Sequence, residues 1–229
     1  MKIGGMQKVS LLDYPGQICA IVFSQGCNFR CPYCHNPELV NPELYGQCLP
    51  EEEVYSFLKT RKGKLDAVTI TGGEPTIQPD LIPFIKHIRK MGYLIKIDTN
   101  GSHPEVLAKL IKDELVDYIA MDVKAPLKKY GTVTRAQICE DKIEQSIESI
   151  VHSGIQYEFR TTVVRSQLTK NDLFHIGRLL KNARLYVLQP FVPTKTLDQE
   201  FLGQTTYSYE EFETIRKKLE KDVSRVAVR

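Results

Sequence analysis

Strand-like and helix-like segments alternate along most of this chain, and that alternation limits the possible folds more than any other feature. Six runs of five to eight residues are rich in valine, isoleucine, threonine or aromatic residues, as β-strands require. The predicted strands are Ile18–Ser24, Ala67–Thr71, Leu94–Thr99, Tyr118–Val123, Tyr157–Val164 and Leu185–Gln189. The amphipathic stretches between or after them are predicted helices at Glu51–Thr60, Leu81–Met91, Pro104–Asp113, Lys142–Ser153, Asn171–Leu180 and Ser208 to Leu219.

Repeated strand–helix alternation predicts an α/β domain with a parallel sheet and right-handed crossovers. The periodicity alone is compatible with either an open doubly wound sheet or a partial barrel. In both architectures the chemistry lies at the carboxyl ends of the strands. The tail Ser224–Val228 is predicted as one more short strand. A length of 229 residues suits a single domain over 1–229.

Composition excludes several classes of protein. Apolar residues make up 42%, which argues against disorder, and 31 basic against 28 acidic residues give a net charge of +3. That charge is too small to require nucleic acid or a membrane as a partner. Apolar runs such as Ile18 to Phe23 are far shorter than the roughly 18 residues of a membrane span. The start Met1 to Gly5 lacks a signal-peptide core, so we expect a cytoplasmic protein with reduced thiols.

Three of the six cysteines form a compact motif directly after the first predicted strand. Cys27, Cys31 and Cys34 are spaced C-x3-C-x2-C. Thiolates are soft ligands that suit iron–sulfur clusters or zinc, and a closed site of either kind needs four ligands. Three thiols therefore leave one metal position open, unless His35 or Cys48 completes a zinc knuckle. We assign no ligand role to the isolated Cys19, Cys48 and Cys139.

Polar motifs follow the later predicted strands. Gly72 and Gly73 allow a backbone to approach a ligand closely, and Glu74 beside them is an acceptor for an ammonium group. The other candidate residues at strand ends are Asp98, Thr99, Asp122, Lys124, Arg160, Val164 and Gln189. Period-two geometry places Asp122 and Lys124 on one face of their strand, opposite Met121 and Val123. The same periodicity places Arg160 and Val164 on one face of the next strand.

The cysteine spacing resembles that of the radical S-adenosylmethionine (SAM) superfamily. More narrowly, Ser10 to Gly16 (SLLDYPG) and Tyr33 to Leu39 (YCHNPEL) are similar to the activating proteins of glycyl-radical enzymes. The resemblance runs from about Gly5 to Pro193. It departs from pyruvate formate-lyase activases at Tyr14, where those have glycine, and at Gln189, near which those have histidine.

This resemblance implies a partial (β/α)6 barrel of parallel strands, a [4Fe–4S] cluster and SAM. Cys27, Cys31 and Cys34 would each bind one iron, and SAM would chelate the fourth through its amino and carboxylate groups. The resemblance assigns the SAM amino group to the Gly72–Glu74 motif, the carboxylate to Lys124 and contacts with SAM to Arg160. The remaining implied cofactor contacts are Tyr33 and Val164 near the adenine, Asp98, Thr99 and Asp122 near SAM or a monovalent cation, and Gln189 in place of the histidine.

The resemblance also implies partners. A glycyl-radical enzyme would be the substrate, with anaerobic ribonucleoside-triphosphate reductase as the expected one, and reduced flavodoxin or ferredoxin would donate electrons. Because the SAM motifs take up most of the chain, little sequence remains for a lid, which favours a macromolecular substrate. The alternatives are a small radical SAM enzyme acting on a low-molecular-weight substrate, similar to a deazapurine synthase, and a non-catalytic iron–sulfur electron carrier.

Overall fold

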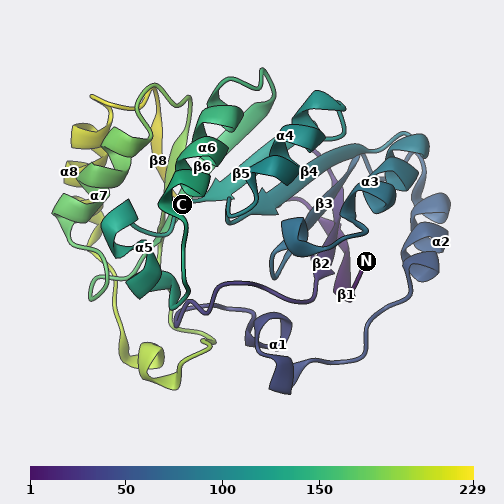
Figure 1. The fold of residues 1–229 in the computed structure, drawn as a ribbon, viewed down its shortest axis with the longest axis horizontal. Helices are drawn as coiled ribbons and strands as arrows, with labels where there is room; N and C mark the ends of the chain where they lie inside the picture. Colours follow the sequence, from purple (N-terminus) through teal and green to yellow (C-terminus); the bar gives the residue numbers. More distant parts are fainter.

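A computed structural model describes all residues 1–229, and its centre is a single sheet of eight strands arranged in sequence order (Figure 1). The strands are β1 (Ile3–Ser10), β2 (Cys19–Ser24), β3 (Ala67–Gly72), β4 (Leu94–Thr99), β5 (Tyr118–Asp122), β6 (Gln156–Val163), β7 (Tyr186–Pro190) and β8 (Val226–Val228). All neighbouring strands pair in parallel except β1 with β2. The predicted parallel α/β sheet is confirmed. No pairing joins β1 to β8, so the curved sheet does not close and forms a partial barrel.

Helices cover one side of the sheet in an arc formed by α2, α3, α4, α6, α7 and α8 (Figure 1). The helices are α1 (Pro37–Val40), α2 (Glu51–Arg61), α3 (Leu81–Lys90), α4 (Pro104–Lys112), α5 (Leu127–Thr134), α6 (Glu140–Val151), α7 (Lys170–Leu179) and α8 (Tyr209–Leu219). Short 3₁₀ turns lie at Pro42–Leu44, Pro75–Ile77 and Gln199–Gly203. None of the helices combines the length and the apolar character that crossing a membrane requires.

The six predicted helices are confirmed, and the predicted tail strand is β8. Three elements were missing from the prediction. They are the edge strand β1, which pairs antiparallel with β2, the short helix α1 and the helix α5. The predicted strand Tyr157–Val164 is one residue too long at its end, because β6 stops at Val163 and the Val164 carbonyl accepts hydrogen bonds from the turn that follows.

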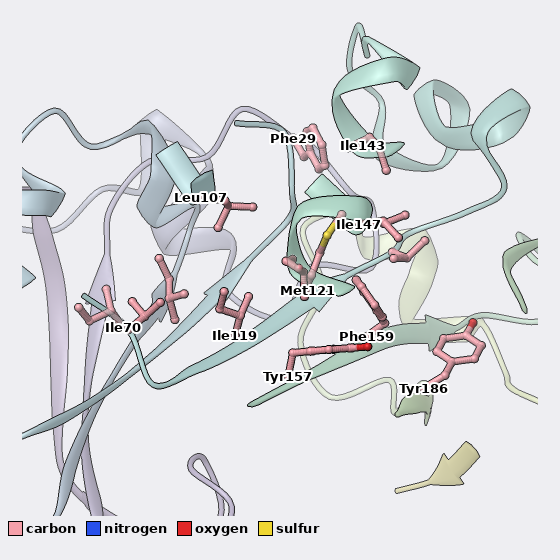
Figure 2. Close-up of a cluster of buried hydrophobic side chains, with 14 of the residues drawn as sticks. Phe29, Ile70, Leu107, Ile119, Met121, Ile143, Ile147, Tyr157, Phe159 and Tyr186 are labelled. Carbon is pink, nitrogen blue, oxygen red and sulfur yellow. The ribbon is translucent and has the colours of Figure 1, made fainter. Parts of the chain in front are cut away.

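Alternate residues of each strand face the helices and form the main core. Figure 2 shows Ile119 and Met121 of β5 beside Phe159 of β6, with Leu107 of α4 and Ile147 of α6 above them. All of these side chains are buried. The side chains between them face the other way, so residues with even numbers on β5 and β6 point into the hollow of the curved sheet.

The amino-terminal part of this hollow is filled by a small apolar cluster. Tyr14, from the turn between β1 and β2, packs there with Cys19, Ile21, Ala67, Tyr118 and Ala120. The ring centres of Tyr14 and Tyr118 lie 5.7 Å apart. The hollow is therefore plugged at the amino ends of the strands, and its open part lies at their carboxyl ends.

Candidate functional site

A cavity of about 450 Å³ lies at the carboxyl ends of the parallel strands. Thirteen of the fourteen predicted site residues line it: Cys27, Cys31, Tyr33, Cys34, Gly72, Gly73, Glu74, Asp98, Thr99, Asp122, Lys124, Arg160 and Gln189. The fourteenth, Val164, does not line the cavity. Because β6 has ended, its side chain leaves the face that carries Arg160 and is fully buried in the main core.

The cysteine loop is held in place by segments far away in the sequence. The Arg30 N–H donates to the Thr134 carbonyl at the end of α5 (2.8 Å), and the Arg30 guanidinium donates to the Cys27 carbonyl (2.6 Å). On the other side, the Asp198 N–H donates to the Pro32 carbonyl at 2.9 Å. These contacts order the loop over the cavity without using any cysteine side chain.

Cys31 is buried and Cys27 and Cys34 are half-buried, and desolvation raises their pKa values, to about 12 for Cys27 and about 11 for Cys31. Cys34 is shifted in the same direction by the same cause. A metal centre must therefore supply positive charge to stabilise the thiolates in this apolar setting. The motif thus suits a strongly charged centre better than free, reactive cysteines.

The donor set does not fit the zinc knuckle considered above. No group of three His, Cys, Asp or Glu side chains converges on the position of a single metal ion. The His35 Nε2 atom lies 3.0 Å from the Val192 carbonyl oxygen, and the Cys48 thiol donates to the Gln25 side chain at 3.3 Å. Three soft thiols that do not converge, next to a cavity, fit an iron–sulfur cluster whose irons are spread apart and whose fourth iron is open.

The turn after β3 presses against the cysteine loop. Gly72 has a φ of 108°, which favours glycine, and a Cβ atom on Gly73 would lie 2.0 Å from the Gly26 carbonyl oxygen. The Glu74 N–H donates to that same carbonyl at 2.8 Å. Only glycine at position 73 permits this contact, so the two loops form one continuous wall.

Glu74 ties the ends of β3 and β4 together. Its Oε1 atom accepts from the Thr76 N–H (3.0 Å) and the Thr99 hydroxyl (2.8 Å), and its Oε2 atom accepts from the Asn100 N–H (2.6 Å). Burial raises the pKa of this carboxyl, although these hydrogen bonds oppose the shift. Glu74 therefore sits in the wall of the cavity as a buried acceptor, and one of its oxygens accepts a single hydrogen bond.

A network of charged side chains from β4, β5 and β6 also lines the cavity. The Asp122 carboxylate accepts from Arg160 Nε (2.8 Å) and from Lys124 Nζ (3.0 Å), and Asp98 accepts from Arg160 Nη1 (3.3 Å). Burial acts to raise the pKa values of both aspartates, but the neighbouring cations outweigh it and hold them below the usual range. The wall therefore presents two fixed cationic groups, on Lys124 and Arg160, to the cavity.

Other residues of the cavity extend the predicted set. Tyr33 is buried, and its hydroxyl has no hydrogen-bond partner, which fits a wall made to meet a polar ligand. Thr162, Asn100 and Asp13 also line the cavity. The alternation along β6 already placed Thr162 on the face of Arg160. Asp13 lies in the turn before β2, and no local pattern indicated that it would reach this site.

Fold and site together define a class of protein. It is an α/β partial barrel in which a loop with three cysteines lines a polar cavity at the carboxyl ends of the strands. A family model described as the Radical SAM superfamily matches residues 21–180. This chain belongs to the radical SAM superfamily, whose cofactors are a [4Fe–4S] cluster and SAM.

Curated relatives cover nearly the whole chain. A protein of Methanocaldococcus jannaschii that bears the name of a glycyl-radical enzyme activating enzyme is 33% identical over 99% of this chain and 95% of its own. The pyruvate formate-lyase-activating enzyme of Clostridium pasteurianum is 29% identical over 96% and 95%. The 7-carboxy-7-deazaguanine synthase of Methanopyrus kandleri is 36% identical over 76% and 84%. The chain is thus a radical SAM enzyme homologous to glycyl-radical enzyme activating enzymes, not a simple electron carrier.

Solved structures support the fold. The structure of Streptococcus suis SuiB bound to S-adenosylmethionine matches with a TM-score of 0.66 at 14% identity. The match covers 91% of this chain and 51% of that one, so this chain spans about half of SuiB. At this identity the likeness establishes the radical SAM fold alone.

Proposed function

We propose that this protein is an activating enzyme that generates a glycyl radical on a partner enzyme, with anaerobic ribonucleoside-triphosphate reductase as the expected partner. The observation that carries the proposal is the position of the cysteine loop. It lines one cavity together with two half-buried basic side chains, Lys124 and Arg160, which are held in place by aspartates. Two relatives that span almost the full chain bear the names of activating enzymes of this kind.

In the proposed site Cys27, Cys31 and Cys34 hold three irons of a [4Fe–4S] cluster and leave the fourth open to SAM. When bound, the reduced cluster supplies one electron that cleaves SAM into methionine and a 5′-deoxyadenosyl radical, which takes a hydrogen atom from the partner's glycine. The chemistry of bond cleavage belongs to these cofactors, and the protein contributes binding, orientation and electrostatics.

The side chains of the cavity have distinct proposed tasks. The Lys124 ammonium and the Arg160 guanidinium neutralise the SAM carboxylate, and Asp122 keeps both cations in position through its two hydrogen bonds. Carbonyl groups of the Gly72–Gly73 turn accept from the SAM amino group, and Glu74 fixes that turn against β4. Tyr33 borders the ligand from the cysteine loop.

Gln189, at the cavity wall on β7, takes the place where pyruvate formate-lyase activases have a histidine. Reduced flavodoxin or ferredoxin is the proposed electron donor, and the reduced cysteines suit a cytoplasmic setting.

The test is glycyl-radical formation followed by electron paramagnetic resonance. Anaerobically reconstituted protein, SAM and a reductant are mixed with purified anaerobic ribonucleotide reductase. We expect a radical on the reductase that is lost in Cys27→Ser and kept in Cys139→Ser, a change of an exposed cysteine outside the site. Formation of 5′-deoxyadenosine without any radical on the reductase would exclude this partner.

A second candidate function is radical chemistry on a small molecule. It is favoured by the similarity of this chain to a 7-carboxy-7-deazaguanine synthase. Product analysis with the substrate of that synthase separates the two functions. Turnover of the small molecule together with no radical on any protein partner would favour this alternative.

A further inference from the structure

Lys96 is a buried lysine that the proposed chemistry does not use. It lies on β4, it is only 2% exposed, and it does not line the cavity. Its ammonium group donates to Asp98 Oδ1 and lies 5.9 Å from the centre of the Tyr118 ring. A buried ammonium group is unfavourable unless it is paired, so the fold keeps this charge under Asp98 at a cost.

The two aspartates of the cavity are fully paired by the chain's own cations. Asp98 accepts from Lys96 through Oδ1 and from Arg160 Nη1 through Oδ2. Asp122 accepts from Arg160 Nε through Oδ1 and from Lys124 through Oδ2. All four carboxylate oxygens therefore already receive a hydrogen bond from a cationic group.

Strand register explains how one guanidinium reaches both aspartates. Arg160 is paired with Asp122 of β5, whereas Asp98 of β4 is paired with Ala120 of β5. Ala120 presents only a methyl group on this face, so the Arg160 side chain can extend past β5 to Asp98. The network is thus a consequence of the sheet geometry rather than a chance surface contact.

The hydroxyl group of the neighbouring Thr99 also has hydrogen-bond partners within the protein. Thr99 Oγ1 donates to Glu74 Oε1 at 2.8 Å and accepts from the Gly101 N–H at 3.1 Å. Asp98, Thr99 and Asp122 were the residues expected to bind a monovalent cation. Three side-chain cations, on Lys96, Lys124 and Arg160, already neutralise the two aspartates, so this donor set does not fit a free cation.

We propose that Lys96 is a built-in cation that replaces a free monovalent ion at this site, so that SAM binding needs neither potassium nor sodium. Lys96 acts as a positioning residue, because it holds Asp98, and Asp98 in turn holds Arg160 at the cavity wall. If SAM draws Lys124 or Arg160 toward its carboxylate, Lys96 stays beneath Asp98, since it is outside the cavity. The inference rests on the proposed SAM site and adds a statement about its ion requirement.

The first test measures SAM affinity by calorimetry on the cluster-loaded protein, in potassium chloride and in choline chloride at the same ionic strength. For the wild type we expect dissociation constants within about twofold of each other, because equal ionic strength gives equal screening. Lys96→Met should bind SAM about tenfold more weakly in choline chloride and recover in potassium chloride, since it loses one charged hydrogen bond that an ion can replace.

Two further variants make the test specific. Lys96→Arg keeps the positive charge and should remain independent of the ion. Lys129→Met removes another lysine–aspartate pair, in which the Lys129 ammonium lies 2.7 Å from the Asp172 carboxylate. The Lys129 side chain is half-exposed, and the pair lies outside the cavity. This variant should show no ion dependence. If Lys96→Met does not fold, the wild type and Lys96→Arg still test the proposal. Each of these two proteins must bind SAM with the same affinity in potassium chloride as in choline chloride.

The second test needs no SAM. An ion that binds the native protein raises its unfolding temperature, so unfolding is compared in the same two salts. The proposal expects no difference for the wild type and a higher temperature in potassium chloride for Lys96→Met. A wild type that is stabilised by potassium, or a Lys96→Met variant that behaves like the wild type in both tests, would overturn it. A wild type that never binds SAM would instead contradict the proposed function, and unfolding would still decide the ion question.

Discussion

At the scale of single residues, the contact between the cysteine loop and the turn after β3 depends on the absence of one side chain. Gly73 lies so close to the Gly26 carbonyl that a Cβ atom cannot be accommodated, and the Glu74 N–H uses that carbonyl as its acceptor. Because both partners are backbone, neither can move aside without shifting a strand end. The geometry of the metal-binding loop is therefore set partly by a residue that bears no functional group.

Gly73→Ala should separate the two loops. We expect a loss of about 1–3 kcal/mol in the free energy of unfolding, as for other overpacked sites, and a lower iron content after reconstitution. Chemical denaturation and iron analysis measure the two effects. Gly46→Ala is the matched control, because a Cβ atom there would meet no atom within 4 Å. Equal stability and iron content for both variants would contradict the role given to Gly73.

A second prediction at the scale of single residues concerns the stability that Asp122 contributes. Burial opposes its ionisation, but Arg160 and Lys124 more than compensate, so its pKa in the folded protein lies below its unfolded value of about 4. The stabilisation is therefore present above that unfolded value and is lost as the pH falls toward the folded one. Asp122→Asn should be less stable than the wild type by about 2 kcal/mol at neutral pH, and this difference should shrink progressively as the pH is lowered below about 5.

Urea denaturation at a series of pH values measures this difference. Asp113→Asn is the control, because it removes an aspartate whose partner Lys86 lies 4.0 Å away at the surface. The free energy of unfolding of this variant should change with pH in the same way as that of the wild type. A difference for Asp122→Asn that is independent of pH would show that the ion network does not stabilise the fold.

At the scale of secondary structure, the elements that bury a regular face were predictable from the sequence, and the others were not. The strands from Ala67 to Gln189 carry continuous β-branched runs because helices or the filled hollow cover both faces. The edge strand β1 contains Gly4 and Gly5 and exposes much of its length, so it lacks this pattern. Helix α5 contains Gly131 and several β-branched residues, which are weak helix formers, and it is stabilised by tertiary contacts instead.

The candidate site follows the same rule. Residues in local motifs, such as the cysteines and Gly72–Glu74, were predictable because their spacing carries the chemistry. Val164 was misplaced because period-two alternation was continued past the end of β6, where a turn begins. Asp13 was missed because its position depends on how the turn before β2 folds back toward the cavity, which no short-range pattern encodes.

Helix capping gives a prediction at this scale. The Ser208 hydroxyl accepts from the Glu211 N–H, and the Glu211 carboxylate accepts from the Ser208 N–H. Ser208→Ala should lower the free energy of unfolding by about 1 kcal/mol, because α8, which packs on α7, loses its N-terminal cap. Ser224→Ala, at an exposed serine outside any helix, is the control and should have little effect. Thermal or chemical unfolding measures both, and equal values would exclude a role for the cap.

At the scale of the whole molecule, the parallel sheet gathers residues from most of the chain into one cavity. Four strands, β3 to β6, lie between Cys27 and Gln189 in sequence, yet both residues line the same cavity. The plug of Tyr14 and its neighbours closes the amino ends, and the carboxyl ends stay open. This polarity gives a cofactor cluster and its ligand a shared site that opens at the carboxyl ends of the strands, which is what the central claim of radical SAM chemistry requires.

The most direct test of that claim is the formation of 5′-deoxyadenosine. Anaerobically reconstituted protein, with its cluster content confirmed, is incubated with SAM and dithionite, and the products are separated by chromatography. We predict 5′-deoxyadenosine and methionine from the wild type and from Cys139→Ser, and none from the triple variant Cys27→Ser, Cys31→Ser, Cys34→Ser. A cluster-loaded wild type that leaves SAM intact, or a triple variant that cleaves it as fast as the wild type, would contradict the account.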